Sequence, residues 1–221
     1  LLVFFKIPET LPLARRTPLK IGSILKVFGR LLSNKKVLGY IFCNSLSYSG
    51  MFCFLSAGSI VYTGLFGVAP KHFGYFFLLN IIVMMTATSL NGKFVTKIGV
   101  EKSLRLGLTI QLIAGVWLLV CGIFHLGLWA TVVGVATYVG LVSVVSSSAN
   151  AAILDMYPEV AGTANSLTGM LRFGIGSVVG MLLALFTIDT ERPMVFAMAI
   201  CIVVAVISYI GLVRGEPQAH N

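Results

Sequence analysis

The sequence predicts an all-α membrane protein, built as a bundle of six transmembrane helices. Six stretches are apolar and uncharged for about the 20 residues that a helix needs to cross a hydrocarbon core of about 30 Å. Basic clusters fall mainly between alternate pairs of these stretches, and 57% of the 221 residues are hydrophobic against 10% charged. Because lipid offers backbone groups no water, each stretch is expected to be a helix that satisfies its own hydrogen bonds.

The expected spans, in chain order, are residues 37–62, 73–90, 106–124, 128–154, 161–188 and 193–213. The charge-free run 106–154 is too long for one crossing, and the segment 124–127 divides it into two. The prolines lie in loops or at helix ends, as at Pro193, so we expect continuous rather than broken helices. Glycine pairs at 134/140 and 176/180 predict close approach between helices.

Residues 1–36 precede the bundle and differ from it in carrying several prolines and many basic residues. The apolar residues 1–5 resemble the end of a preceding transmembrane helix, and prolines interrupt the chain between 8 and 18. Over 19–32 the apolar residues recur at three- and four-residue spacing, which favours an amphipathic helix lying in the membrane interface. A solvated linker with chance periodicity is the alternative. We therefore divide the chain into a cytoplasmic linker (1–36) and a six-helix bundle with a short cytoplasmic tail (37–221).

The positive charge is distributed unevenly along the chain, which has a formal net charge of +9. Half of the 16 Lys and Arg lie in 6–36, and four more lie between the second and third spans, at Lys93, Lys97, Lys102 and Arg105. The opposite side receives only Lys71 and Arg192. This bias predicts that the basic loops and the C-terminus are cytoplasmic, and it argues against a nucleic-acid partner.

The sequence carries no pattern typical of an enzyme or a metal protein. The four cysteines, Cys43, Cys53, Cys121 and Cys201, lie inside predicted spans without a CxxC pair, so we expect reduced thiols. No HExxH, Gly-rich phosphate loop or nucleophile elbow is present, and no Asp or Glu lies inside a span. His72, His125 and His220 are expected to be solvated. We therefore expect no enzymatic activity, no cofactor and no metal.

Polar residues are concentrated in the first, fourth and fifth spans, which predicts that these spans line a cavity. The nearly featureless third and sixth spans are expected to be outer supports, and the second is intermediate. The predicted cavity residues are Asn44, Tyr48, Asn80, Ser143, Ser147, Asn165, Thr168 and Arg172.

Arg172 is the sharpest single signal. It lies about 16 Å along the fifth span at about 1.5 Å per residue, near the bilayer middle. A guanidinium there costs at least about 2.5 kcal/mol, so a carboxylate, helix carbonyls or cavity water must offset it. Two interpretations stay open: a functional group that faces a cavity, and a structural group that is hydrogen-bonded to neighbouring backbone.

Several motifs together resemble one family of transporters. The segment IPETLP at 7–12, followed by Arg15-Arg16, is similar to the junction after the sixth helix in drug-resistance transporters of the Bcr/CflA family, within the major facilitator superfamily. Further similar stretches are FLSA at 54–57, FGYFFLLN at 73–80 and AGTANSL at 161–167. The segment 92–99, with Gly92, Lys97 and Gly99, resembles a degenerate copy of the superfamily's cytoplasmic loop signature.

The resemblance implies that this chain is the C-terminal half of a twelve-helix transporter in the bacterial inner membrane, with a missing N-terminal six-helix half as its partner. It implies proton-coupled export of drugs or small metabolites by alternating access, with carboxylates supplied by the other half. Arg172 stands where the family is expected to have an uncharged polar residue such as Gln. A positive charge at this position does not fit the family's usual preference for cationic drugs. The alternatives are a metabolite facilitator and a non-transporting membrane module that binds a partner.

Overall fold

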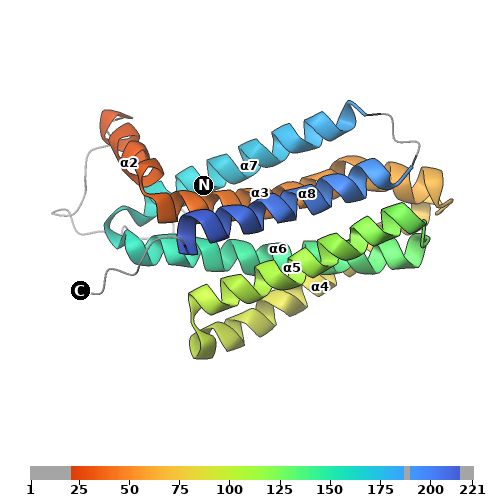
Figure 1. Ribbon diagram of the computed structural model, residues 1–221, viewed down its shortest axis with the longest axis horizontal. Coiled ribbons are helices and arrows are strands. Elements are labelled where there is room, and N and C mark those ends of the chain that lie inside the picture. The colour runs from red at the N-terminus through yellow and green to blue at the C-terminus, as the bar shows by residue number, and fades with distance from the viewer. Residues whose placement is uncertain (1–20, 187–189, 215–221) are drawn as a thin grey trace, which may run out of the picture.

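The computed structural model describes residues 21–186 and 190–214, and in this part of the chain long helices run side by side (Figure 1). The predicted end of a preceding helix at 1–5 and the C-terminal tail lie outside the described residues. The elements are α2 (Ile21–Ser33), α3 (Lys35–Ser59), η2 (Ile60–Leu65, a π-helical turn), α4 (Pro70–Ile98), α5 (Val100–Phe124), α6 (Leu128–Met156), η3 (Pro158–Val160), α7 (Ala161–Ala184), α8 (Arg192–Ser208) and η4 (Tyr209–Arg214).

The six predicted crossings are confirmed as six helices long and apolar enough to span a membrane: Lys35–Leu65, Pro70–Ile98, Val100–Phe124, Leu128–Met156, Pro158–Ala184 and Arg192–Val213. Most of them begin or end beyond the predicted limits because helical geometry continues past the apolar run into polar and charged residues. The described part of the fifth helix ends before the predicted limit of 188, and residues 187–189 are outside the described range. The chain is thus a multi-pass membrane protein.

Local chemistry fixes where these helices start and stop. The Asn34 side chain accepts hydrogen bonds from the backbone N–H groups of Lys36 and Val37, at 3.0 and 3.2 Å, and so caps α3. Pro70 begins α4, where its missing N–H is harmless. Gly99 and Gly127 have φ values of 85° and 88°, a region that glycine enters at no steric cost, and they form the tight turns around α5.

α3 is the central helix, because it packs against α6, α7 and α8. α5 packs on α6 and α8, and α4 packs on α6. Of the residues of α4, only Asn80 is buried, so α4 is the most exposed of the six crossings. The third and sixth spans, α5 and α8, contribute no residue to the cavity described below, which agrees with their predicted role as supports. Their windows are nevertheless more buried than that of α4, because they pack against other helices of the bundle.

Glycines bring the helices close together, as predicted. On α7, a Cβ at Gly176 would lie 2.7 Å from the Phe52 ring, and one at Gly180 would lie 2.8 Å from the Ser56 hydroxyl. On α6, Gly134 faces Leu118 of α5 and Gly140 faces Val83 of α4. Small residues at these positions allow the backbones to approach and to gain packing contacts.

α2 forms the helix that the periodicity predicted, and it docks on the turn between α6 and α7. Leu31 is buried, and Arg30 lies 3.7 Å from the Glu159 carboxylate and 5.2 Å from the centre of the Tyr157 ring. The Asn34 amide also donates a 3.0 Å hydrogen bond to the Tyr157 hydroxyl. Leu25 stays exposed. An interfacial position for α2 remains a prediction.

His125 is exposed to solvent, as expected, but it also has partners in the protein that were not expected. The imidazole is half exposed, but both ring nitrogens have partners that begin α8, Glu191 and Arg192. The turn between α5 and α6 was correctly placed, but the sequence did not reveal that the start of α8 returns to it.

Candidate substrate cavity

A cavity of about 500 Å³ lies between α3, α4, α6 and α7. Its volume is in the range of small-molecule sites, about 300 to 1,000 Å³. Its wall is largely apolar, with a few polar side chains on the facing helices. The lining residues are Tyr48, Met51, Phe54, Leu55, Phe77, Asn80, Ile81, Met84, Thr88, Val139, Val142, Ser143, Ser146, Ser147, Asn150 and Arg172.

Arg172 lies at the middle of α7 and, among the described residues that line the cavity, is alone in carrying a charge. One terminal nitrogen donates a 2.7 Å hydrogen bond to the Ser146 hydroxyl on α6. The guanidinium carbon lies 4.7 Å from the centre of the Tyr48 ring and 4.8 Å from that of Phe173. Aromatic faces attract a cation most strongly when both are desolvated, so the two rings offset part of the cost of burial.

The Nε of Arg172 is buried and has no hydrogen-bond partner in the protein. A buried donor without an acceptor costs about 1–3 kcal/mol, and more when the group is charged. Native proteins rarely leave such a group unpaired unless it serves a function. Arg172 therefore brings to the cavity a buried donor that no protein acceptor satisfies.

An aromatic cluster holds Tyr48 beside the guanidinium. The rings of Tyr48, Phe52 and Phe173 lie with their centres 5.5 to 6.4 Å apart, and two of the three pairs meet edge to face. Such pairs add about 0.5–1.5 kcal/mol beyond simple burial. Since Tyr48 and Phe52 come from α3 and Phe173 from α7, the cluster links the two helices directly behind the cavity.

The opposite wall combines small hydroxyls of α4 and α6. Thr88 and Ser143 share a 2.6 Å hydrogen bond between their hydroxyl oxygens, and Ser147 donates to the carbonyl of Val144 at 3.2 Å. These hydroxyls keep lone pairs free, because a hydroxyl accepts two hydrogen bonds and donates one. Together with Asn80 and Asn150 they give the cavity donors and acceptors without a second charge.

Behind the cavity a buried polar layer crosses the core. The Ser47 hydroxyl donates to Gln111 at 2.7 Å, and the Gln111 amide donates to the Tyr138 carbonyl at 3.1 Å. The side chains of Asn44 and Ser45 and the Tyr138 hydroxyl have no hydrogen-bond partner. This layer therefore joins α3, α5 and α6 by polar contacts that are only partly satisfied.

The predicted cavity residues separate into two groups. Tyr48, Asn80, Ser143, Ser147 and Arg172 line the cavity together. The other three lie elsewhere: Asn44 is buried in the core, Thr168 is buried and donates to the Ala164 carbonyl at 2.9 Å, and Asn165 is exposed.

The segment 92–99, which resembles the superfamily's cytoplasmic loop signature, covers the last turns of α4 and the turn into α5. Gly99 makes this turn, while Gly92 and Lys97 are exposed on the last turns of α4. Beside it, the Ser103 hydroxyl donates to Asn91 and accepts from Ser148 at 3.2 Å, so α4, α5 and α6 are joined by side chains at this end.

Sequence reasoning did not select Ser146 and Thr88 as site residues, although both line the cavity. The available signal was spacing: Ser143, Ser146, Ser147 and Asn150 recur every three or four residues and so share one face of α6. In the same way Asn80 and Thr88 lie about two turns apart on α4.

A bundle of six apolar helices around a cavity with one partly buried cation is typical of a membrane protein of the transporter class. The family model of the Major Facilitator Superfamily matches residues 1–181, and the chain belongs to that superfamily.

Two curated relatives agree with this assignment. The chain is 47% identical over 208 residues to a "Bicyclomycin resistance protein homolog" of Haemophilus influenzae, covering 94% of this chain and 52% of the relative. It is 28% identical over 214 residues to an "Uncharacterized MFS-type transporter YdgK" of Bacillus subtilis, covering 97% and 53%. These likenesses confirm the resemblance to the Bcr/CflA transporters. The chain spans about half the length of these relatives, and no solved structure matches it significantly.

Proposed function

We propose that the chain is the C-terminal six-helix half of a secondary active transporter that exports drugs or small metabolites by proton-coupled alternating access. The observation that carries the proposal is Arg172, a guanidinium with an orphaned donor at mid-helix in a cavity of drug-like size. A charge in the middle of a membrane helix is retained when it serves a substrate or ion pathway.

Within the cavity, Arg172 acts as an electrostatic anchor. Its remaining donors bind either an anionic or acceptor-rich group of the substrate, or a carboxylate contributed by an N-terminal half. In the second case the guanidinium favours the ionised carboxylate and so promotes release of its proton. The aromatic rings and the small hydroxyls then supply contact surface for molecules of varied shape.

In the membrane, we propose that the protein lies in the bacterial inner membrane with its basic loops on the cytoplasmic side. The turn between α4 and α5 carries Lys93, Lys97, Lys102 and Arg105, and α2 carries Lys26 and Arg30. Such clusters are retained on the cytoplasmic face during insertion. Labelling of engineered cysteines from each side, at Lys93 and at Lys71, tests this orientation.

The decisive experiment compares the full-length transporter with its Arg172→Gln and Arg172→Lys variants in proteoliposomes. Bicyclomycin, after which the Haemophilus relative is named, is the first compound to assay. We expect substrate-driven proton movement in the wild type and loss of transport in Arg172→Gln. The control is Arg105→Gln, which removes an exposed arginine near the start of α5.

The outcomes separate the possible activities. Unchanged transport and unchanged pH dependence in Arg172→Gln overturn the role of Arg172. Transport without proton movement indicates a metabolite facilitator, and binding without transport indicates a non-transporting membrane module.

A further inference from the structure

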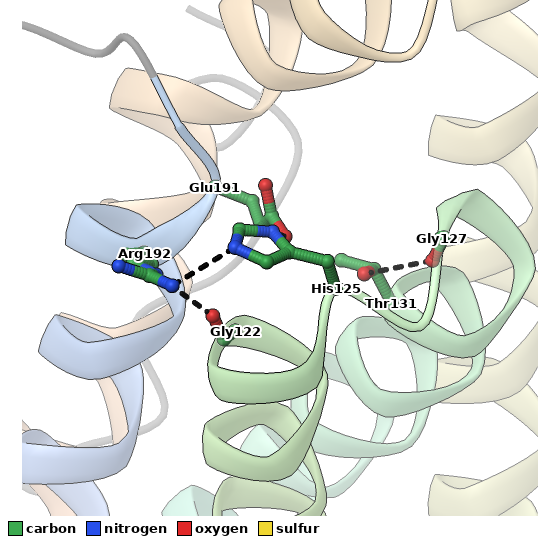
Figure 2. Close-up of polar contacts among 6 residues, drawn as sticks. All are labelled: Gly122, His125, Gly127, Thr131, Glu191 and Arg192. Atoms are coloured by element: carbon green, nitrogen blue, oxygen red, sulfur yellow. Dashed lines mark hydrogen bonds and ion pairs between the residues drawn. The ribbon is translucent and has the colours of Figure 1, made fainter.

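The α5–α6 turn and the start of α8 meet at the end of the bundle opposite α2 (Figures 1 and 2). Here His125 lies between Glu191, the N-cap residue of α8, and Arg192, the first residue of that helix. Its Nδ1 is 2.7 Å from the Glu191 Oε1, and its Nε2 is 2.9 Å from a terminal nitrogen of Arg192. The Nε of Arg192 also donates to the Gly122 carbonyl at 3.0 Å. We call these three side chains, His125, Glu191 and Arg192, the His125 junction.

The partners fix the protonation of the imidazole. A guanidinium only donates hydrogen bonds, so the Nε2 facing Arg192 must be an acceptor. The ring hydrogen is then on Nδ1, where it is donated to the Glu191 carboxylate. The junction as it stands therefore requires a neutral imidazole.

Adding a proton to His125 changes the two contacts in opposite directions. The contact with Glu191 becomes a hydrogen bond between opposite charges and is strengthened. The contact with Arg192 is lost, because Nε2 becomes a donor facing a donor and two positive charges meet. One protonation thus separates α8 from the α5–α6 turn at Arg192 while holding it at Glu191.

Solvent reaches the imidazole but hardly reaches its acid partner. The His125 side chain is 51% exposed and the Glu191 side chain 9%. Other described titratable groups of the elements that end or begin here are the buried Cys121 thiol, one turn earlier on α5, the buried Tyr62 of η2, and Lys71, His72 and Tyr75 in the first turns of α4. On α6, Thr131 uses its hydroxyl on the Gly127 carbonyl at 3.1 Å, so it does not replace either partner.

The junction also completes the end of α5. His125 adopts the left-handed conformation, with φ 52° and ψ 50°, and is alone among the described non-glycine residues in having positive φ. Carbonyls in the last turn of a helix lack partners within the helix, and Arg192 supplies one to Gly122. When the guanidinium moves away, the Gly122 carbonyl loses its hydrogen bond from Arg192. The end of α5 and the start of α8 are then weakened together.

We propose that His125 is a proton-binding site which, through Arg192, controls how firmly the start of α8 is held against the end of α5. With a neutral imidazole the His125 junction is closed; when His125 takes up a proton, Arg192 is released and the first turn of α8 becomes loose. The proposal does not depend on substrate or on Arg172, so it stands or falls separately from the transport function.

The test is hydrogen–deuterium exchange on the full-length protein in lipid nanodiscs, measured at pH 5 and at pH 8. Rates are corrected for intrinsic exchange and followed in peptides covering 121–131 and 190–200. Wild-type protection in both peptides is expected to fall about tenfold at pH 5, as when one hydrogen bond to a charged group is lost.

Three variants make the result specific. His125→Gln keeps an acceptor for Arg192 and a donor for Glu191 without titrating, so its protection should be the same at both pH values. Arg192→Gln presents either a donor or an acceptor to the ring, so acid should not reduce its protection. His72→Gln, the matched control at the same end, should keep the wild-type response. A wild type insensitive to pH, or a His125→Gln variant that responds like the wild type, overturns the proposal.

Discussion

Arg172 and Arg192 belong to consecutive helices, α7 and α8, yet they are bound in opposite ways. Arg172 lies at mid-helix between two aromatic rings, with one hydroxyl partner and a buried Nε that has none. Arg192 begins its helix and has its Nε on the Gly122 carbonyl and a terminal nitrogen on His125.

The comparison separates an arginine available to bind a ligand, Arg172, from an arginine that stabilises the contact between two helix ends, Arg192. The Arg192 guanidinium, at a helix end, spends its Nε and one terminal nitrogen on protein acceptors and so stabilises the native packing. A guanidinium placed where burial is costly, and then left partly unpaired, retains that capacity. The difference therefore predicts that the two residues respond differently when they are changed.

The largest effect is expected for Arg172→Gln. Loss of a hydrogen bond to a charged group costs about 1.5–3 kcal/mol, so transport should fall about 10- to 100-fold. Initial rates in proteoliposomes measure this, with Arg172→Lys recovering only part of the loss because an ammonium lacks the planar fork. A rate within twofold of wild type would contradict the assignment.

The Ser146→Ala variant should have the next largest effect. It removes the hydroxyl that holds one end of the guanidinium, so we expect about a fivefold to tenfold fall in transport, equivalent to about 1 kcal/mol or slightly more. Ser147→Ala serves as the neighbouring control, because Ser147 bonds only its own helix backbone. Equal effects of the two substitutions would show that Ser146 does not position Arg172.

A smaller effect is expected when the aromatic face is removed. Tyr48→Leu should lower transport about twofold to fivefold, since a partly desolvated cation–π contact contributes about 0.5–1 kcal/mol. Tyr48→Phe keeps the ring and should behave as the wild type. If the phenylalanine variant were as impaired as the leucine variant, the hydroxyl rather than the ring would be the functional group.

The smallest effect on transport is expected for Arg192→Ala. Transport at pH 8 should change less than about twofold, while the protein unfolds more easily by about 1–3 kcal/mol, because the Gly122 carbonyl and His125 lose a donor. Thermal unfolding in detergent measures the stability. A strong transport defect in a protein of normal stability would abolish the distinction between the two arginines.

The sequence predicted well whatever depends on local composition. Six crossings follow from apolar length alone, and Arg172 is recognisable because a charge in such a run is rare. Properties that depend on neighbouring helices were predicted less well. Asn44 and Asn165 are as polar as Asn80, but only the orientation and packing of each helix decide which side chain reaches the cavity.

The His125 junction shows the same limit more clearly. His125 and Glu191 are 66 residues apart in the sequence, and Glu191 gives no local sign that it is buried. Only the return of α8 to the end of α5 joins them, which no periodicity within either segment indicates.

Gly176 lies one turn after Arg172 on α7, and a methyl group there would strike the ring of Phe52, the residue that supports Tyr48. The close approach of α7 to Phe52, and through Phe52 to Tyr48, thus depends on the absence of a side chain at Gly176. A single carbon added at this position, which is not part of the cavity lining, would force the Phe52 ring or the helices α3 and α7 to shift.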